Sequence, residues 1–561
     1  MVELRQPPQG EVRRTGERAG GRRRSRHVQG GWDRSGVISR FLASRGFEEN
    51  PFASTNADKE PRLSQYFVPP PYFTSVKGDP RNPKSNVIFA PRGGGKTAQK
   101  VMLEEYAETQ NTSRFLCITY DSFRHISRSK ITSLNTDWHL SQVIQRLLSA
   151  TLALIQTSPL HDLGKSDKIL LNFCFKKYLG SLNEAEAIEI LKSIKSDVEK
   201  VREFIQAQAG NITKIVSAIP TIWGLPPLDL ELSTKELKDE PPLYIIERLI
   251  TIIQSYGYDS VYVLVDRVDE ISEFANDAIS CGKFIAPLLT ELNLLELEGL
   301  SFKFFLWDQI EDHVVEAGLR TDRVLVHRLN WSADNLSEML SRRIAAYSNS
   351  QVSSLNDLIS EDSDIDLHKL ICCLGNGSPR DVIRLVGRII DEHTKISDTH
   401  EPLTWSSIES GIKNYSRERS IELYGAEKIN DLSKIGVVSF TIGEIANDIF
   451  RVSHQAGRNK IQNLMNVGAV IKSGDIENPG NRPLHQYSIV DPRLAYAVSS
   501  YKLSDFLSFN AYICPRCETI LVRDGETANC HECAFEFPLD VSSSLMEYCS
   551  NAALPLTKQT K

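Results

Sequence analysis

The stretch that decides the fold is residues 86–97, which read NVIFAPRGGGKT. Residues 86–89 predict a short buried strand, and residues 95–106 predict the helix that follows it. Between them, three consecutive glycines (93–95) let backbone N–H groups turn inward without a Cβ clash, which forms a nest for a phosphate group. The positive end of the helix dipole adds to the attraction for an anion. The pattern therefore predicts a phosphate-binding loop (P-loop).

Two side chains at the end of this loop have separate chemical roles. Lys96 supplies a mobile positive charge for the β- and γ-phosphates, and the Thr97 hydroxyl can bind Mg²⁺. Position 90 is alanine where the strict motif has glycine, a replacement that such loops tolerate. We expect ATP with Mg²⁺ as the ligand, and the residues expected to hold it are Ala90, Pro91, Arg92, Gly93, Gly94, Gly95, Lys96, Thr97 and Ala98.

An acidic segment follows a second apolar run, residues 261–265 (VYVLV). Asp266 stands at the carboxyl end of this predicted strand, where it is placed to hold Mg²⁺ through water. Asp269 and Glu270 come shortly after it, and either could orient or deprotonate an attacking water. Glu270 is the preferred base and Asp269 the alternative. Together with Lys96, these acids predict hydrolysis of a phosphoanhydride.

Further apolar runs at residues 114–120 and 302–307 predict two more strands, so the fold class is an α/β P-loop NTPase with a parallel sheet. An insertion at about residues 124–240 reads mainly helical, and its clearest element is an amphipathic helix over residues 184–208. The expected domains are a disordered basic arm (1–40), the P-loop domain (41–330), a helical lid (331–425), a winged helix (430–500), a zinc ribbon (510–540) and a tail (541–561).

The loop and the acidic segment together resemble the STAND class of signal-transducing NTPases. This class belongs to the wider AAA+ group, which also includes origin-recognition-type ATPases. The resemblance spans about residues 45–420. It implies a polar sensor at the end of the fourth strand, for which Asp308 and Gln309 are candidates. A polar strand end without that role is an equally good interpretation of these two residues.

The same resemblance implies two arginine functions. Arg320 or Arg323, just before a fifth strand predicted at residues 324–329, would reach the nucleotide of a neighbouring copy, although a surface ion pair with the intervening aspartate explains them equally well. In the lid, Arg380 would act as a second sensor that faces the phosphates. Ser378 and Pro379 precede it and are suited to the N-cap and the first turn of a helix.

Two CxxC pairs near the C-terminus give a strong metal signal. Cys514 and Cys517 are followed after twelve residues by Cys530 and Cys533. Four thiolates that meet at one point match the closed, tetrahedral coordination of structural Zn²⁺. The spacing resembles a zinc ribbon, and a catalytic role is not expected because no coordination position is left open.

Residues 430–500 resemble a winged helix. The segments 441–450 and 455–467 predict its second and third helices, and strands at 468–472 and 486–490 flank a wing at 473–484. The third helix would expose Arg458, Lys460 and Asn463 opposite the apolar Ile461, Leu464 and Met465. That face suits a DNA groove and its phosphates. A unit that only packs or autoinhibits is the alternative.

Composition sets the remaining limits. The chain has 561 residues and a net charge of −7, so several domains are expected and any nucleic-acid surface must be local. The first 40 residues hold ten arginines and four carboxylates, which suit either a phosphate- or RNA-binding arm or a disordered tail. No long apolar run predicts a membrane span. Scattered cysteines favour a reducing compartment, and the cytoplasm is the default.

These features predict an ATP-hydrolysing switch that couples nucleotide state to engagement of a target or partner. By analogy with the family, the role would lie in bacterial defence or regulation. The alternative is a nucleotide-dependent DNA-binding loader or regulator with low turnover. Expected partners are ATP, DNA through the winged helix, a partner protein or further copies of the chain, and no membrane.

Overall fold

The computed structural model describes most of the chain. The described residues are 38–550, apart from 110–112, 124–133, 158–162, 181, 209–239 (of which only 214 is described), 273–276, 361–363, 479–481, 524–526 and 540–541. The predicted basic arm therefore lies almost wholly outside them. Among the described helices, none combines the length and the apolar character that a membrane crossing requires.

A six-stranded sheet of order β3-β2-β4-β5-β1-β6 forms the centre of the first half of the chain. Its strands are β1 (Asn86–Ala90), β2 (Phe115–Tyr120), β3 (Ile194–Lys195), β4 (Ser260–Val265), β5 (Leu300–Trp307) and β6 (Leu325–Arg328). All neighbours pair in parallel except β3, which pairs antiparallel with β2. The prediction of a parallel α/β sheet is thus confirmed for five strands, and the short edge strand makes the sheet mixed.

The predicted helix over residues 184–208 is wrong as a single element. The structure has α7 (Glu184–Lys192), then β3, then α8 (Glu199–Gln208). The edge of β2 explains the break, because the Thr119 N–H donates to the carbonyl of Ser193 at 2.8 Å and Ile118 pairs with Ile194. An edge strand leaves unpaired backbone groups, and this short strand satisfies part of that edge. Ile194 is buried in β3, and a core-facing helix would bury it as well, so apolar spacing could not distinguish the two arrangements.

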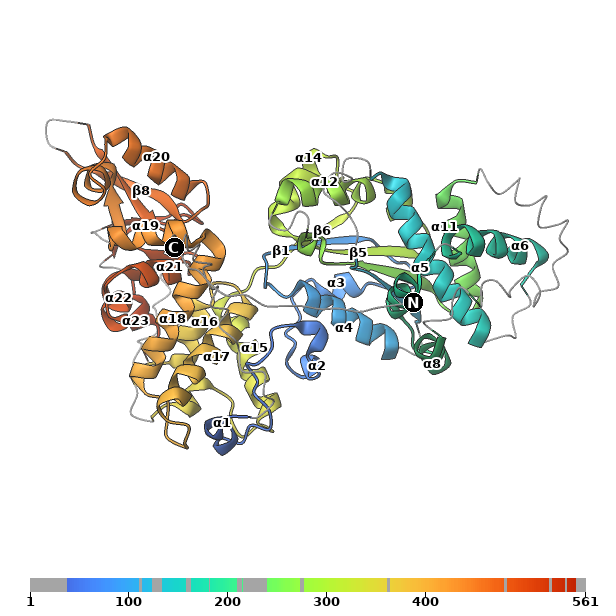
Figure 1. Ribbon diagram of the computed structural model, residues 1–561, viewed down its shortest axis with the longest axis horizontal. Coiled ribbons are helices and arrows are strands. Elements are labelled where there is room, and N and C mark those ends of the chain that lie inside the picture. Colours follow the sequence, from blue (N-terminus) through green and yellow to red (C-terminus); the bar gives the residue numbers. More distant parts are fainter. Residues whose placement is uncertain are drawn as a thin grey trace, which may run out of the picture. The chain divides into compact units, whose positions relative to one another are not determined.

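Helices cover both faces of the sheet. On one face, α3 (Phe73–Lys77) and α4 (Lys96–Thr109) pack on alternate strand residues such as Ile88, Leu264 and Phe305. The opposite residues of the same strands pack on α5 (Thr136–Thr157), α11 (Pro242–Ser255) and α12 (Ala278–Leu289). Figure 1 shows α3 and α4 on one side of the strands and α12 and α14 on the other. Burial on both faces explains why the strands are almost uniformly apolar.

Shorter elements complete this part of the chain. They are α6 (Lys165–Cys174), η3 (Phe175–Leu179), η4 (Val268–Glu270), α13 (Leu292–Leu295), η5 (Asp308–Ile310) and α14 (Glu311–Glu316). The described part of the insertion between β2 and β4 is therefore mainly helical.

One buried side chain in the sheet is unusual because it is a lysine. Lys303 in β5 is fully buried, and its Nζ donates to the carbonyl of Lys84 at 2.7 Å and to Asn86 Oδ1 at 2.6 Å. Among the described residues no carboxylate pairs with it. Burial disfavours the charged form and lowers the pKa of Lys303 to about 7.

This lysine predicts a pH-dependent stability. Its folded-state pKa lies below the ordinary value, so between about pH 7 and the ordinary value the unfolded state binds more protons, and stability rises with pH. The stability gained at high pH is lost progressively as the pH falls toward 7, and below about 7 both states carry the proton. In calorimetry from pH 6.5 to 9, Lys303→Met should remove most of the rise in unfolding temperature, whereas the exposed Lys84→Met should not. An unchanged rise in Lys303→Met would contradict this assignment.

The segment that precedes the sheet in the chain packs against helices that come after the sheet. Its elements are α1 (Arg40–Ser44), η1 (Ala57–Lys59) and α2 (Leu63–Tyr66), and the later helices are α15 (Ala333–Tyr347), η6 (Leu355–Leu358), α16 (Leu367–Leu374), α17 (Pro379–Ile396) and α18 (Trp405–Tyr424). Glu60 and Arg343 form a buried ion pair at 2.7 Å, and the Tyr347 hydroxyl also donates to Glu60. The early segment is therefore anchored on α15.

The C-terminal elements form small sheets and short helices. They are α19 (Ala426–Ile435), β7 (Ser439–Thr441), η7 (Glu444–Ile449), α20 (His454–Met465), β8 (Val470–Ile476), β9 (Leu484–Ile489), α21 (Pro492–Val498) and α22 (Leu503–Phe509). Strands β7, β9 and β8 pair antiparallel in that order. Two hairpins follow, formed by β10 (Ala511–Ile513) with β11 (Ile520–Val522) and by β12 (Thr527–Asn529) with β13 (Glu536–Pro538).

The expected tail from residue 541 onward needs correction. It contains α23 (Leu545–Tyr548), which begins with a capping box between Ser544 and Glu547 and buries Leu545 completely. This helix is held on α16, where Lys369 Nζ donates to the Tyr548 carbonyl at 2.7 Å. Polar composition concealed the element, although the S-x-x-E spacing was a usable signal. Residues 551–561 lie outside the described part.

Candidate nucleotide-binding site

The glycine loop connects β1 to α4, and its backbone has the conformation that the sequence predicts. Gly93 and Gly95 have φ values of 82° and 95°, which favour glycine. Space is limited as well, because a Cβ on Gly93 would lie 3.0 Å from Ser378 Oγ and 3.1 Å from Arg380 Cβ. The loop thus needs glycine both for its own turn and for its contact with the start of α17.

The two polar side chains of the loop take different positions. Lys96 is 8% exposed, and its Nζ donates to the carbonyls of Ala90 at 3.1 Å and Pro91 at 3.3 Å. Burial lowers the pKa of Lys96, and Asp269 and Asp266 oppose this change. With its ammonium resting on loop carbonyls, Lys96 is close to the place where phosphate oxygens would replace them.

Thr97 contacts the acidic strand end directly. Its Oγ1 donates to Asp266 Oδ2 at 2.9 Å, although 169 residues separate them. The sheet order explains the contact, because β5 lies between β1 and β4 with Ala90 opposite Trp307 and Phe304 opposite Val265. Asp266 is 1% exposed, and burial raises its pKa to about 6. A hydroxyl and a carboxylate that meet in this way offer oxygen ligands of the kind that Mg²⁺ prefers.

The two candidate bases have different surroundings. Arg92 Nε donates to Asp269 Oδ2 at 2.9 Å, and Arg92 Nη2 donates to the Asp269 carbonyl at 2.6 Å. The Asp269 side chain is 7% exposed and therefore fixed by the loop's own arginine. The Glu270 side chain is 60% exposed, and its nearest cation is Arg267 Nε at 3.7 Å. Sequence patterns did not indicate the pairing of Arg92 with Asp269, which depends on the folded loop.

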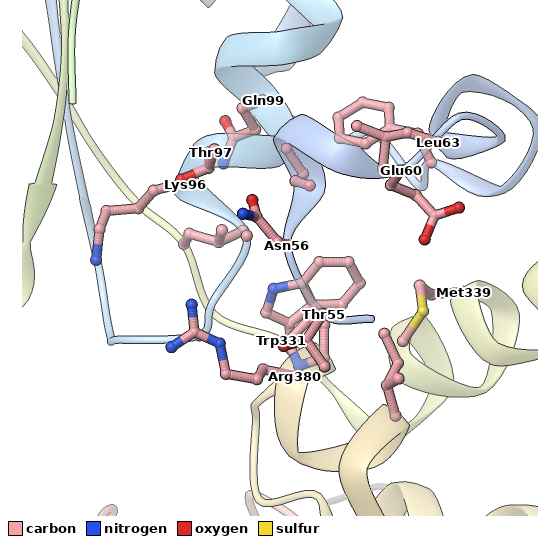
Figure 2. Close-up of a pocket in the computed structure, with 18 of the residues that line it drawn as sticks. Thr55, Asn56, Glu60, Leu63, Lys96, Thr97, Gln99, Trp331, Met339 and Arg380 are labelled. Atoms are coloured by element: carbon pink, nitrogen blue, oxygen red, sulfur yellow. The ribbon is translucent and has the colours of Figure 1, made fainter. Parts of the chain in front are cut away.

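The lid helix α17 contributes Arg380. Ser378 Oγ accepts from the Asp381 N–H at 3.2 Å, which is the N-cap that the sequence predicts. The Arg380 N–H lies 3.5 Å from the Gly93 carbonyl, and Figure 2 shows its side chain extending toward the loop that carries Lys96. Arg380 therefore faces the same space as the P-loop.

A cavity of about 500 Å³ contains these groups, a size suitable for a nucleotide. Residues from four segments line it: the early segment with Asn56, Val68 and Pro70, the P-loop with Lys96 and Thr97, the acidic segment with Asp266 and Glu270, and the lid with Trp331, Met339, Arg380 and Ile383. Figure 2 shows Asn56, Lys96 and Trp331 among them. Trp331 Nε1 donates to the Gly94 carbonyl at 2.7 Å. Neither the early segment nor Trp331 carried a sequence signal for this role, because only the tertiary fold brings them to the loop.

The remaining arginine candidates form ion pairs at the surface, and the two sensor candidates are exposed to solvent. Arg320 pairs with Asp322 at 2.7 Å and Arg323 pairs with Glu296 at 2.7 Å, with all four side chains about half exposed. Arg320 thus forms the predicted surface ion pair with the intervening aspartate, whereas Arg323 pairs with a glutamate from another segment. Asp308 and Gln309 are exposed in the short helix after β5, and Asp308 interacts electrostatically with Lys96.

The four C-terminal cysteines form one cluster. The Sγ atoms of Cys514, Cys517, Cys530 and Cys533 all lie within 4.8 Å of one another. Cys517 and Cys530 approach to 3.5 Å, and Cys514 and Cys533 to 3.7 Å. A Zn–S bond of about 2.3 Å gives a tetrahedral S–S edge of about 3.8 Å. The cluster thus fits a Zn²⁺ ion held between two hairpin knuckles.

The expected basic face of α20 is only partly present. Arg458 and Asn463 are exposed, while Ile461 and Leu464 are buried, as predicted. Lys460 differs, because its Nζ donates to Asp431 Oδ2 in α19 at 2.6 Å and lies over the Phe450 ring. The ion pair with Asp431 directs this lysine toward α19 rather than toward solvent. The pattern within α20 alone could not indicate this, because the carboxylate lies on another helix.

Comparisons with known proteins are limited to distant structural similarity. No family model and no curated protein matches the chain. Three solved structures to which it is similar are the Aeropyrum pernix ORC1 protein in complex with DNA (11% identity, TM-score 0.32, 82% of this chain and 93% of that chain), the Aeropyrum pernix ORC2 protein in ADPNP-ADP complexes (11%, 0.35, 78% and 97%) and the Thermotoga maritima RuvB Holliday junction branch migration motor (11%, 0.25, 77% and 91%). Because these TM-scores are below 0.5, the function below is inferred from this chain's own residues.

Proposed function

We propose that this chain binds ATP with Mg²⁺ and hydrolyses it. The observation that carries the proposal is the contact between Thr97 and Asp266 beside the buried Lys96, at the carboxyl edge of the sheet where β1 and β4 flank β5. A nest of backbone N–H groups, an ammonium, a hydroxyl and a carboxylate at one point are the groups that phosphoryl transfer requires. Bound Mg²⁺ would neutralise phosphate charge, and Thr97 and Asp266 would hold it.

The proposed roles of the other residues follow from their surroundings. Lys96 moves from the loop carbonyls to the β- and γ-phosphates, and Arg380 contacts the γ-phosphate from the lid. Glu270 orients and deprotonates the attacking water, because its carboxylate is accessible to solvent and close to the cavity. Asp269 instead holds Arg92 and shapes the loop. The apolar walls from Val68, Met339 and Ile383 suit the base of the nucleotide.

Substitution of Glu270 tests this division of roles. Glu270→Gln should lower kcat by about a hundredfold with little change in ATP affinity, because only proton abstraction is lost. Asp269→Asn should mainly weaken ATP binding, since Arg92 loses its charged partner. Steady-state phosphate release and calorimetric ATP titration separate the two effects. Full turnover in Glu270→Gln would show that this residue is not the base.

We further propose that the nucleotide state controls the C-terminal modules. Helices α19 and α20, η7 and the β7-β9-β8 sheet have the order expected of a winged helix, and the cysteine hairpins have that of a zinc ribbon. These modules would present a binding site for a target. The first candidate function is therefore a signalling switch in a regulatory system.

A DNA-binding loader or regulator is the second candidate, and the exposed face of α20 favours it. Arg458, Asn459, Gln462 and Asn463 are exposed there, and such side chains donate to phosphates and base edges. Duplex DNA that stimulates ATP turnover would support the loader. Turnover that ignores DNA but responds to a protein would support the switch.

A further inference from the structure

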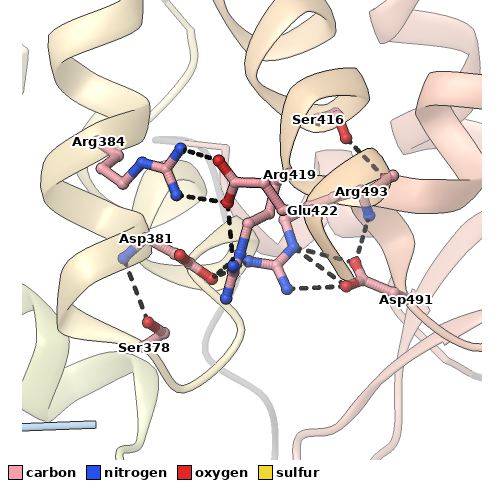
Figure 3. A network of polar contacts seen from close by, with 9 residues as sticks. Ser378, Asp381, Arg384, Ser416, Arg419, Glu422, Asp491 and Arg493 are labelled. Atoms are coloured by element: carbon pink, nitrogen blue, oxygen red, sulfur yellow. Dashed lines mark hydrogen bonds and ion pairs between the residues drawn. The ribbon is translucent and has the colours of Figure 1, made fainter. Parts of the chain in front are cut away.

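A buried group of charges joins the start of α17 to α21 in the C-terminal module. This charge network consists of Asp381, Arg384, Arg419, Glu422, Asp491 and Arg493 (Figure 3). At its centre, Asp381 Oδ2 accepts from Arg493 Nη1 at 2.6 Å and from Arg419 Nε at 3.1 Å. The side chains of Asp381 and Arg493 are only 1% and 5% exposed. A residue of α21 thus contacts the first turn of the lid helix.

Arg493 is fixed by a second carboxylate. Asp491 accepts from Arg493 Nε at 3.0 Å and from Arg493 Nη2 at 2.7 Å. Burial alone would raise the pKa of Asp491, but Arg493 holds it below its usual value. Because the guanidinium is planar, this two-point contact directs Nη1 toward Asp381.

The balanced charges of the network resist separation of α17 from α21. It contains three arginines and three carboxylates, and Arg384 and Glu422 close it on the solvent side with contacts of 2.6 and 2.8 Å. Separation of a buried pair leaves an uncompensated charge, which is strongly unfavourable. The first turn of α17 and the start of α21 are therefore expected to move together.

The other side of the same turn faces the nucleotide cavity. Arg380 directly precedes Asp381 and lines the cavity, and its N–H lies 3.5 Å from the Gly93 carbonyl. Ser378, which caps the turn, has its Oγ 3.0 Å from the place of a Cβ on Gly93. The turn is thus in contact with the P-loop on one side and with Arg493 on the other.

We propose that Arg493 is a positioning residue for Arg380, acting through Asp381, and that this link joins the γ-phosphate to the C-terminal module. The inference rests on the proposed role of Arg380 at the γ-phosphate. When ATP draws Arg380 inward, the charge network carries the shift to α21, and ADP, which lacks the γ-phosphate, does not. Linkage is reciprocal, so a ligand on the C-terminal module that shifts α21 would alter the preference for ATP over ADP.

The ratio of ADP to ATP dissociation constants tests this link. Calorimetry with ADP and a non-hydrolysable ATP analogue should show that Arg493→Met lowers the preference for the ATP analogue by about tenfold. ADP affinity should stay unchanged, as it should in Arg380→Ala. Arg493→Lys keeps a charge for Asp381 and should restore part of the preference. Arg388→Met, on the same helix but paired with Glu418 outside the network, is the matched control and should keep the full preference.

The outcomes separate the two levels of the proposal. A wild-type ratio in Arg493→Met, together with a reduced ratio in Arg380→Ala, would overturn the link and leave the role of Arg380 intact. An unchanged ratio in Arg380→Ala would refute that role itself, and the link with it. A loss of preference in Arg388→Met equal to that in Arg493→Met would also overturn the link, because disturbance of α17 alone would then explain the result.

Hydrogen exchange on the unmodified protein tests the same link without a variant that must fold. The ATP analogue should slow amide exchange in Pro492–Val498 relative to ADP, together with exchange in the first turn of α17. Exchange in α21 that is identical in both nucleotides, while the first turn of α17 responds, would overturn the link.

Discussion

Replacement of Lys96 by alanine is expected to lower the affinity for ATP, measured with Mg²⁺ present, by about a thousandfold. Removal of a desolvated charge from its phosphate partner costs about 4 kcal/mol. The ammonium is buried and its only hydrogen bonds in the described structure go to loop carbonyls, so no structural ion pair would be lost. The effect should therefore fall on nucleotide binding more than on folding. Calorimetric titration with ATP measures it.

Lys84→Ala is the matched control for this substitution. Lys84 is an exposed lysine just before β1, so its loss removes the same charge from the protein without touching the loop. ATP affinity should then remain at the wild-type value. Intact ATP affinity in Lys96→Ala would show that the loop does not bind the phosphates.

Removal of zinc is the second large effect that we expect. Cys530→Ser should abolish the binding of one zinc per chain and unfold the two hairpins β10–β11 and β12–β13. Their apolar core is small and consists mainly of Leu521, Ala528, Phe537 and Leu539, with the cysteines themselves. So small a core does not stabilise a fold alone, and we expect metal binding to supply the missing free energy. Elemental analysis and amide exchange over residues 511–538 measure the two effects.

Cys174→Ala serves as the control for zinc, because Cys174 is buried in the core of the first half, away from the cluster. It should keep the full zinc content. Nucleotide affinity should be nearly unchanged in Cys530→Ser, since the cavity takes no residue from the hairpins. Retention of stoichiometric zinc in Cys530→Ser would contradict a four-cysteine site.

Local sequence patterns were sufficient to predict the elements that carry the proposed phosphate site. The loop, β4 and β5 were predictable because glycine runs, apolar strands and a capping serine act within a few residues. The contact of Thr97 with Asp266 could be expected, since carboxyl ends of parallel strands share one edge. The pairing of Arg92 with Asp269 could not, because it depends on how the loop folds over η4.

Longer-range contacts explain the remaining differences. The break in residues 184–208 comes from the edge of β2, and the turn of Lys460 comes from Asp431 on another helix. Helical periodicity describes one element at a time, so it gives no information about the edge of β2 or about Asp431. The same holds for the early segment, whose Glu60 is bound to Arg343 nearly three hundred residues later and whose Asn56 lines the cavity.

The most direct measurement is phosphate release by the purified chain from ATP, with Mg²⁺ and with Mg²⁺ chelated. We predict turnover that requires Mg²⁺, that falls about a hundredfold in Glu270→Gln, and that disappears in Lys96→Ala. Phosphate release that persists unchanged in both variants, or wild-type protein that neither binds nor hydrolyses ATP, would contradict the assignment of this cavity as an ATPase site.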